Sequence, residues 1–310
     1  MLARIMTKPS VSITIISYNQ AQYLRMALDS AVAQDYEPLE IVAADDASTD
    51  GSREILRSYA ERFPGKVVPL INRDNLGLAG NRDRAMSACS GDFIAWLDAD
   101  DLAYPHRISR QVEFMEKDAS CSISYHDMQV IRGTEVTVET LYGGGRPALE
   151  GDHRVLLRNE NFIISSSVMI RAGLLPRRGY SFEHGQTYSD YHFFVRMARL
   201  GRIGFLNEVL GGYRRHPQSA TGSARQTRSG VRRRRALALN AMYREFREER
   251  PLLRYCLARF HLSQLSGAAR ERDPWIIAHS TAHLIGLFPE TLEAFRDRRR
   301  NRYLLPSFEP

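Results

Sequence analysis

Three aspartates at the end of an apolar segment are the residues of this chain best suited to chemistry. The segment Phe93–Leu97 is apolar and β-prone, which predicts a buried strand. Three carboxylates follow it directly, those of Asp98, Asp100 and Asp101. Carboxylates at the end of a buried strand repel one another and resist desolvation unless something compensates them. A hard divalent cation does so, because it takes oxygen ligands and shares them with substrate phosphates. The alternative is a solvated turn that leads into a helix expected from Pro105.

Alternating strand and helix patterns precede this acidic segment and must position it. Apolar β-prone runs alternate with stretches of helical spacing, which predicts a parallel, doubly wound sheet. Ligands of such sheets bind at the carboxyl ends of the strands, so we expect polar residues at those ends to converge on one crevice. The expected strands span 11–16, 39–44, 66–71 and 93–97, and the expected helices span 23–32, 52–59 and 81–89. The polar residues at the strand ends are Ser17, Tyr18, Asp45, Asp46 and Asn75.

The pattern after residue 104 contains more strand and is less regular. A helix carries Ile108, Val112 and Met115, and Asp190 opens another helix that is rich in apolar residues. Gly143–Pro147 reads as a flexible loop, and arginine-rich helices follow from about Ser223. The expected strands in this half span 122–131, 163–170, 203–206 and 209–213.

Length, composition and charge restrict the class of protein. The 310 residues, 43% of them apolar, suffice for one large domain with an appendage. The three cysteines are widely spaced and predict a reducing compartment. Residues 1–10 lack a signal-peptide core, and no run approaches the roughly 18 apolar residues of a membrane span. Of the net charge of +7, the last 90 residues carry +9, from 18 arginines against 9 acidic residues. The arginines of this tail could simply cover solvated helix faces, or the tail could meet anionic lipid. Nothing beside the arginines indicates nucleic-acid binding.

Several stretches together resemble family 2 glycosyltransferases with the GT-A fold. Each is weak alone, but four occur in order within about 100 residues. Two further stretches carry the likeness on to about Ser219, although Asn81-Arg82 inverts the usual Arg-Asn order. The Gln-x-x-Arg-Trp motif of processive synthases is absent, which indicates a non-processive enzyme. The stretches are Val11–Asn19, Asp45–Ser52, Asn75–Arg82 and Asp98–Asp101, then Ser189–Arg196 and Tyr213–His216.

The resemblance implies an α/β architecture and a domain organisation. The fold class is a GT-A type, Rossmann-like and mostly parallel sheet with flanking helices, plus a C-terminal helical region rich in arginine. The expected glycosyltransferase domain spans 1–220. Its nucleotide-sugar half covers about 10–104 and its acceptor half about 105–220, and a helical extension covers 221–310.

The resemblance also assigns roles to residues. Asp100 is the expected ligand of Mn²⁺ or Mg²⁺, and His216 is expected to be a third ligand or a phosphate contact unless it is only structural. Asp190 is the expected general base, although an aspartate there could equally serve as an N-cap of a helix from Tyr191. Asp98 or Asp101 could instead cap the following helix, and His184 could lie at the acceptor pocket. The expected nucleotide-sugar-binding residues are Ser17, Tyr18, Asp46, Asn75, Arg82 and Asp98.

Two of these nucleotide-binding roles have structural alternatives. Tyr18 could cover a uracil face while Asp46 accepts a hydrogen bond from the base, which would indicate a UDP-sugar. Asp46 could instead bond the backbone of its own loop. Arg82 could reach a phosphate, or could pair with Asp74 or Asp83.

The expected activity is therefore inverting, metal-dependent transfer of a sugar from a nucleotide-diphosphate sugar to a hydroxyl acceptor. Such hexosyltransferases act in the assembly of cell-surface polysaccharide, lipopolysaccharide and other glycans, so a glycan or glycolipid acceptor is expected. The expected location is the cytoplasm, with peripheral contact at the inner face of the cell membrane through the basic tail. Two alternatives remain open: a sugar-1-phosphate nucleotidyltransferase, and a non-catalytic protein that binds nucleotide sugars or a membrane surface.

Overall fold

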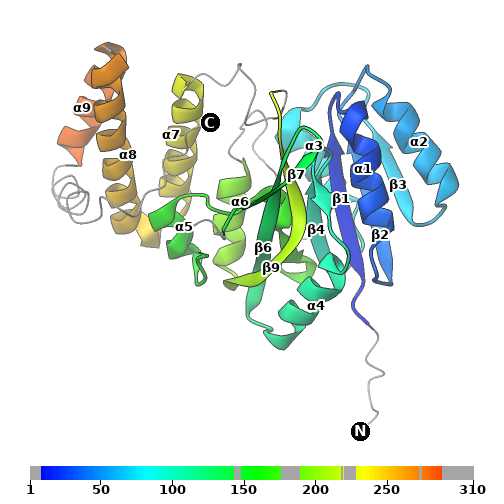
Figure 1. The fold of residues 1–310 in the computed structure, drawn as a ribbon. Helices are drawn as coiled ribbons and strands as arrows, with labels where there is room; N and C mark the ends of the chain where they lie inside the picture. The colour runs from blue at the N-terminus through cyan, green and yellow to red at the C-terminus, as the bar shows by residue number, and fades with distance from the viewer. Residues whose placement is uncertain are drawn as a thin grey trace, which may run out of the picture. The chain divides into compact units, whose positions relative to one another are not determined.

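The computed structural model shows a chain that divides into two compact units, and each is described by itself (Figure 1). The first unit comprises Met1–His153 and Phe162–Ser219, and the second comprises Arg154–Asn161 and Ala220–Pro310. The residues that the structure describes are 8–142, 148–175, 189–217, 219, 228–271 and 274–287.

A mixed, mostly parallel sheet forms the centre of the first unit. Its N-terminal half has the order β3-β2-β1-β4, and all neighbours in it are parallel, as the alternating pattern predicts. Parallel pairing brings the carboxyl ends of these strands to one edge, because Ser17 of β1 lies opposite Asp45 of β2 and Ile16 lies opposite Asp98 of β4. The four strands are β1 (Val11–Ser17), β2 (Leu39–Asp45), β3 (Val67–Ile71) and β4 (Phe93–Asp98).

The sheet continues beyond β4 with strands from the second half of the unit, in the order β8-β6-β9-β5. Strand β8 runs antiparallel to both of its neighbours, β4 and β6, whereas β6 and β9 form a long parallel pair. The short β5 and the edge strand β7 pair antiparallel with β9 and β6. These strands are β5 (Leu102–Ala103), β6 (Cys121–Arg132), β7 (Glu135–Thr140), β8 (Met169–Arg171) and β9 (Arg202–Arg215).

Helices cover both faces of this sheet. The odd-numbered residues of β1 pack on one face with apolar residues of α1, α2 and α4, and Figure 1 shows α1 and α2 side by side. Ile16 packs on the opposite face against α3, and Trp96 of β4 stacks there on Phe193 of α6. The helices are α1 (Ala21–Val32), α2 (Ser52–Arg62), α3 (Gly77–Ser87), α4 (Arg107–Lys117) and α6 (Ser189–Ala198).

Several predicted elements of the second half are wrong in extent or type. The strand predicted over 163–170 is a 3-10 turn, η1 (Ser165–Ser167), followed by the three residues of β8 and a second turn, η2 (Ala172–Leu174). The two strands predicted over 203–206 and 209–213 are one continuous strand, β9, whose pairing with β6 shifts register between His126 and Met128. Strands β5 and β7 were not predicted from the sequence.

The part of the second unit that the structure describes is helical. It contains most of α5 (His153–Asn159), together with α7 (Arg228–Glu245), η3 (Arg247–Glu249), α8 (Arg250–Glu271) and α9 (Pro274–Gly286). Within it Arg154 pairs with the buried Glu249 at 3.0 Å, and the thiol of Cys256 donates to the carbonyl of Leu157 at 3.0 Å. Across the described residues, no helix combines the length and the apolar character that crossing a bilayer requires.

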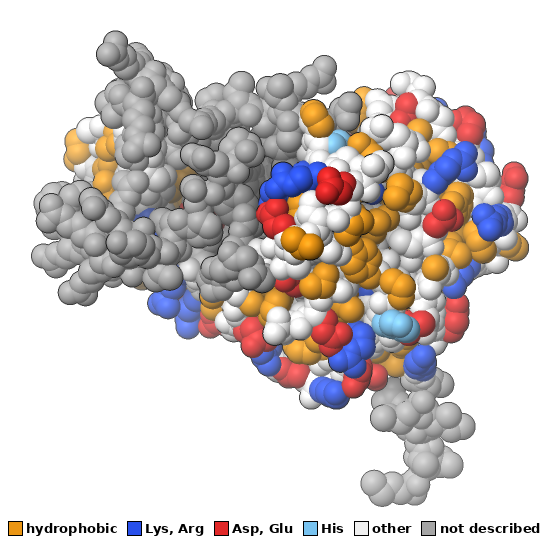
Figure 2. Space-filling view, viewed as in Figure 1, with side chains coloured by type: hydrophobic (Ala, Val, Ile, Leu, Met, Phe, Trp, Pro, Cys, Tyr) orange, Lys and Arg blue, Asp and Glu red, His pale blue; other side chains and the backbone are white. Residues whose placement is uncertain are grey.

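The surface of the described chain carries both signs of charge. Figure 2 shows basic and acidic side chains interspersed on one face of the molecule, with hydrophobic side chains between them. Exposed ion pairs such as Arg110 with Glu208 and Arg132 with Glu139 belong to this mixed surface. Such pairs contribute little to stability.

Candidate active site

The carboxylate of Asp98 is held by protein groups on both of its oxygens. The guanidinium Nη2 of Arg82 donates to Oδ1 at 2.7 Å, and the hydroxyl of Ser165 donates to Oδ2. The backbone N–H of Asp98 donates to the hydroxyl of Ser166 at 3.0 Å. The side chain is 26% exposed, so one face of this carboxylate still opens toward a ligand. Helix α3 and turn η1 together fix the first aspartate of the motif.

Asp100 faces His216, which lies just beyond the end of β9. Its Oδ2 is 2.9 Å from the Nε2 atom of His216, and the two side chains are 11% and 3% exposed. The ring of Tyr23 on α1 packs against the imidazole with a centroid separation of 4.6 Å, and the Arg214 guanidinium lies 4.9 Å from the same Tyr23 ring. Helix α1 therefore orients His216, which was predicted to bind the same metal ion as Asp100.

Asp101 is buried and binds the backbone of β9. Its Oδ1 accepts from the N–H of Arg214 at 2.8 Å, and the Arg214 Nε donates to the carbonyl of Asp100 at 2.9 Å. Burial first, and then the carboxylates of Asp100 and Asp98, raise the pKa of Asp101 well above its ordinary value. The prediction that Asp101 caps the following helix is wrong, because α4 begins at Arg107 and no side chain caps it.

The donor set of Asp100 and His216 fits Mn²⁺ or Mg²⁺. The Asp100 Oδ2 and His216 Nε2 atoms lie 2.9 Å apart, so one carboxylate oxygen and one imidazole nitrogen are available at the same place. Among the residues that the structure describes, no group of three or more His, Cys, Asp or Glu side chains could hold a metal. Ions of this kind often take only one or two carboxylates from the protein and fill the remaining positions with water and substrate phosphate. Asp98 is less suited as a ligand, because Arg82 and Ser165 occupy its two oxygens.

The ends of β1 and β2 place an exposed aromatic ring near a buried carboxylate. Tyr18 follows β1 directly and is 52% exposed, while Ser17 and Asp46 are buried. The Asp46 Oδ1 accepts from the N–H of Leu76 at 2.7 Å, and the Asn75 side chain donates to the Asp46 carbonyl at 3.3 Å. The backbone partner of the Asp46 carboxylate is thus on the loop that follows β3, whereas the alternative drawn from the sequence expected a partner in the loop of Asp46 itself.

Asn72 is a site residue that the sequence reasoning missed. Its side-chain amide donates to the carboxylate of Asp46 and to the side chain of Asn81, both at 3.0 Å. Asn81 in turn donates to the Ala44 carbonyl at 3.2 Å. The available signal was the position of Asn72, which is a polar residue directly after the strand that ends at Ile71.

Arg82 lies between two predicted site carboxylates. It is 1% exposed, its Nη2 is 2.7 Å from Asp98, and its Nε is 3.7 Å from Asp190. Burial acts to lower the pKa of Arg82, but Asp98 and Asp190 outweigh it and the pKa is raised. The alternative pairing of Arg82 with Asp74 or Asp83 is wrong, because its carboxylate partners are Asp98 and Asp190.

Asp190 lies in the first turn of α6. The helix begins at Ser189, so Asp190 is a helical residue and is not the N-cap of a helix from Tyr191. Its side chain is 20% exposed. Helix N-termini favour negative charge, and the guanidinium of Arg82 lies beside this carboxylate, so both favour an acidic side chain at this position.

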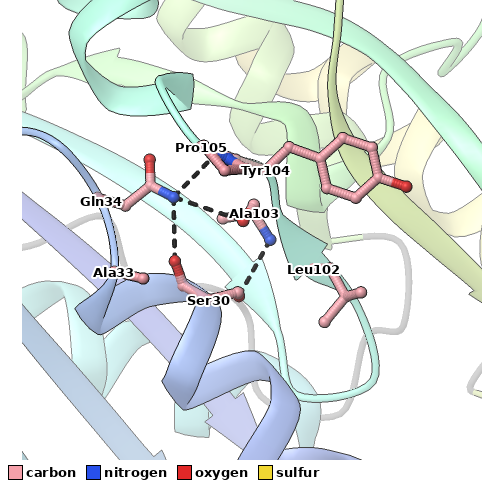
Figure 3. Close-up of a pocket in the computed structure, with 7 residues that line it drawn as sticks. All are labelled: Ser30, Ala33, Gln34, Leu102, Ala103, Tyr104 and Pro105. Atoms are coloured by element: carbon pink, nitrogen blue, oxygen red, sulfur yellow. Dashed lines mark hydrogen bonds between the residues drawn. The ribbon is translucent and has the colours of Figure 1, made fainter.

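The segment after the acidic motif is bound by two polar side chains, Ser30 of α1 and Gln34 just after that helix. Gln34 donates to the carbonyl of Tyr104 at 3.0 Å, and the Ser30 hydroxyl accepts from the N–H of Ala103 at 3.1 Å (Figure 3). The Gln34 Oε1 accepts from the N–H of Ile108 at 3.1 Å. Ser30, Gln34 and residues 102–105 line a small pocket of about 180 Å³, and none of the predicted site residues lines it. We therefore regard this pocket as part of the scaffold that holds the motif.

Two predicted features lie outside the described residues. His184, expected near the acceptor pocket, belongs to the segment 176–188. The side chains of the arginines at 232–235 and all residues from 288 onward fall outside them as well.

Comparisons with known proteins find similarity to the family that the motifs indicate. The sequence profile described as "Glycosyl transferase family 2" matches residues 12–178. EpsE of Bacillus subtilis, a provisionally named glycosyltransferase, is 37% identical over 208 residues, which cover 65% of this chain and 72% of EpsE. An uncharacterised protein of Mycobacterium tuberculosis is 32% identical over 226 residues, or 69% of this chain. The matched region spans only 61% of that relative's length.

Solved structures share the fold at low sequence identity. TarS of S. aureus (residues 1–349, in complex with UDP-GlcNAc) has a TM-score of 0.64 and 18% identity, with 93% of this chain and 92% of that chain covered. The mannosyltransferase PcManGT of Pyrobaculum calidifontis, in complex with GDP-Man and Mn²⁺, has a TM-score of 0.57 and 20% identity. That comparison covers 96% of this chain and 82% of PcManGT.

Proposed function

Because the chain belongs to glycosyl transferase family 2 and has the GT-A fold, we propose that it transfers a sugar from a nucleotide-diphosphate sugar to a hydroxyl acceptor. One observation supports this most directly. A carboxylate at the start of α6, that of Asp190, lies 3.7 Å from the guanidinium that also binds Asp98 at the end of β4. A candidate base is thus held next to the carboxylates expected at the donor.

The nucleotide half of the donor would lie against the ends of β1 and β2. Tyr18 offers an exposed ring for a base to stack on, and the buried Asp46 offers an acceptor for a base N–H. We propose UDP as the nucleotide, since one carboxylate acceptor suits the imide of uracil. The TarS structure contains UDP-GlcNAc and the PcManGT structure contains GDP-Man, so the fold accommodates either base.

Asp100 and His216 would hold the divalent cation, which we propose to be Mn²⁺ or Mg²⁺. When bound, such an ion neutralises the charge that develops on the leaving diphosphate. Arg214 holds the backbone of the acidic loop in place. Its side chain donates to the Asp100 carbonyl, and its backbone N–H donates to the Asp101 carboxylate. Both ligands are therefore held by β9.

Asp190 would act as the general base. A carboxylate oxygen of Asp190 accepts the proton of the acceptor hydroxyl, while the hydroxyl oxygen forms a bond to the anomeric carbon and the bond from that carbon to the diphosphate breaks. A single displacement of this kind inverts the anomeric centre. A donor with an α-linked diphosphate should therefore give a β-linked product.

The acceptor and the site of action in the cell are the next part of the proposal. We propose a glycan or glycolipid acceptor in the assembly of cell-surface polysaccharide or lipopolysaccharide. The last 90 residues carry a net charge of +9, which suits peripheral contact with anionic lipid on the cytoplasmic side of a membrane. Sedimentation with acidic vesicles at low salt tests this contact, and equal binding to neutral vesicles would contradict it.

A panel of nucleotide sugars with Mn²⁺ tests the proposed function. A true donor at 100 times its dissociation constant should stabilise the protein by about 2.7 kcal/mol, which a thermal shift detects. EDTA should abolish transfer, and added Mn²⁺ or Mg²⁺ should restore it. Asp100→Ala should lower transfer by about 10³-fold or more, because a catalytic ion contributes several kcal/mol and each 1.4 kcal/mol is tenfold. Full activity of Asp100→Ala, or a product that retains the donor's configuration, would contradict the proposal.

A further inference from the structure

Arg82 makes contacts that a simple phosphate-binding arginine would not need. Its side chain is 1% exposed, and it lies over the indole of Trp96 at 4.2 Å from guanidinium carbon to ring centroid. Two carboxylates flank it, that of Asp98 at 2.7 Å and that of Asp190 at 3.7 Å. A buried cation is costly unless opposite charges and hydrogen bonds compensate it. The two carboxylates and the aromatic face supply this compensation.

These contacts join three separate elements. Arg82 comes from α3, Asp98 from the end of β4 and Asp190 from the start of α6. The same indole that Arg82 covers also packs against Phe193 and Phe194 of α6, at centroid separations of 5.1 and 5.3 Å. The first turn of α6 is therefore fixed to β4 both by charge and by aromatic packing.

From this arrangement we propose that Arg82 is a positioning residue that sets the placement of Asp190 relative to Asp98. The inference rests on the proposed function, since it assigns Asp98 to the donor and Asp190 to proton removal. A planar guanidinium can present separate N–H groups to two carboxylates in a fixed geometry. Here Nη2 donates a hydrogen bond to Asp98, whereas Nε lies 3.7 Å from Asp190 and forms an ion pair without a hydrogen bond. One side chain then determines how far the base lies from the donor-binding carboxylate. Small displacements at this level cost large factors in rate.

The test compares Arg82→Lys with Arg84→Lys. Both substitutions keep the charge on α3, but Arg84 is exposed and so serves as the matched control. A lysine ammonium is a single point charge and cannot hold both carboxylates in the same geometry. We expect Arg82→Lys to lower kcat by about 10-fold or more, and to weaken binding of UDP with Mn²⁺ by about 3-fold or more in calorimetry. Arg84→Lys should change neither value.

A double-mutant cycle separates positioning from general structural damage. If Arg82 acts through Asp190, then Arg82→Lys in an Asp190→Asn background should lower kcat by less than about 3-fold further. Losses that multiply would overturn the proposal, as would an Arg82→Lys protein that turns over and binds UDP like the wild type. An effect on only one of the two measurements would overturn it as well.

A second cycle keeps the proposal testable if Arg82→Lys does not fold or if no donor is turned over. Asp98→Asn, Asp190→Asn and the combined variant each change the melting temperature. Because both carboxylates share one cation, we expect the shifts of the single variants not to add in the combined variant. Additive shifts would overturn the bridge through Arg82. If the shifts do not add but the wild type transfers no sugar, the proposed function is wrong and the bridge stands.

Discussion

Two buried arginines approach β4 from opposite faces of the sheet, and they are compensated in different ways. Arg82 of α3 has carboxylate partners, Asp98 and Asp190, and its pKa is raised. Arg107 of α4 has neutral partners instead. Its Nη2 donates to the carbonyls of Trp96 and Val168 at 2.9 and 3.1 Å, and its Nε donates to Gln111 at 3.1 Å.

Their electrostatic consequences differ accordingly. Burial lowers the pKa of Arg107 to about 9, although Asp101 and Asp98 act to raise it. A guanidinium with carboxylate partners can control where those carboxylates lie, whereas one with carbonyl partners fixes only the backbone. From this comparison we expect substitutions on the α3 face to change turnover and substitutions on the α4 face to change stability.

Arg82→Met should give the largest effect on stability. The substitution leaves two mostly buried carboxylates without their cation, so we expect the free energy of unfolding to fall by about 3 kcal/mol. Urea unfolding measures this change. A loss of less than about 1 kcal/mol would mean that Asp98 and Asp190 do not depend on Arg82, and the distinction between the two arginines would fail.

Asp190→Asn sharpens the comparison through turnover. It keeps the size of the side chain but cannot accept a proton, so we expect kcat to fall by about 10²-fold while the affinity for UDP with Mn²⁺ stays unchanged. Gln111→Leu provides the counterpart on the α4 face, because Gln111 binds Arg107, Ser124 and the Ser167 carbonyl. It should lower stability and leave kcat within about 3-fold. If Gln111→Leu lowered kcat by about 10²-fold and Asp190→Asn lowered only the stability, the comparison between the two faces would be wrong.

Arg107→Met should cost less than Arg82→Met. It removes hydrogen bonds to two carbonyls but also removes a buried charge that lacks a direct ion pair among the described residues. These effects oppose each other, so we expect a loss of about 1 kcal/mol in the free energy of unfolding. A loss as large as that of Arg82→Met would show that carbonyl partners compensate a guanidinium as fully as carboxylates do.

The smallest expected effect is the pH dependence of the difference in stability between the wild type and Arg107→Met. The folded pKa of Arg107, about 9, lies below its ordinary value of 12.5. Between these values the unfolded chain binds more protons, so the stability from this group rises with pH above about 9 and levels off well below 9. Raising the pH from 8 to 10 should therefore stabilise the wild type relative to Arg107→Met by roughly 0.7 kcal/mol per pH unit. An unchanged difference would indicate that Arg107 stays charged.

The first half of the fold was predictable because its signals are local. Strands β1 to β4 are apolar runs bounded by polar turns, and the sequence identifies each of them within about two residues. The strand predicted at 163–170 failed for a physical reason. Hydroxyls of Ser165 and Ser166 bind the carboxylate and the N–H of Asp98, and such side-chain bonds favour a turn over a strand. The partner of these serines is 67 or 68 residues away, so no local pattern reveals it.

The candidate site shows the same division. Local motifs identified Asp98, Asp100, Asp190 and His216 as residues of interest. The pairing of Arg82 with both Asp98 and Asp190 depends on the packing of α6 against Trp96, which spacing along the chain does not encode. Strand β7 is an instructive omission, because its exposed Val136 and Val138 alternate with polar residues and give a strand signal without a buried face.

The attachment of the acidic loop to β9 has a consequence for how the protein is made. Arg214 and His216 lie 113 and 116 residues after Asp101 and Asp100, the residues whose side chains they contact. At synthesis rates of roughly 5 to 20 residues per second, the ribosome completes the acidic loop roughly 6 to 20 s before its partners exist. A nascent chain in that interval can pair β1 to β4 but lacks the strand that holds Asp100 and Asp101 in place. The competent site is therefore among the last parts of this unit to form, and an arrested chain that ends before residue 214 should bind UDP with Mn²⁺ far more weakly than the complete protein.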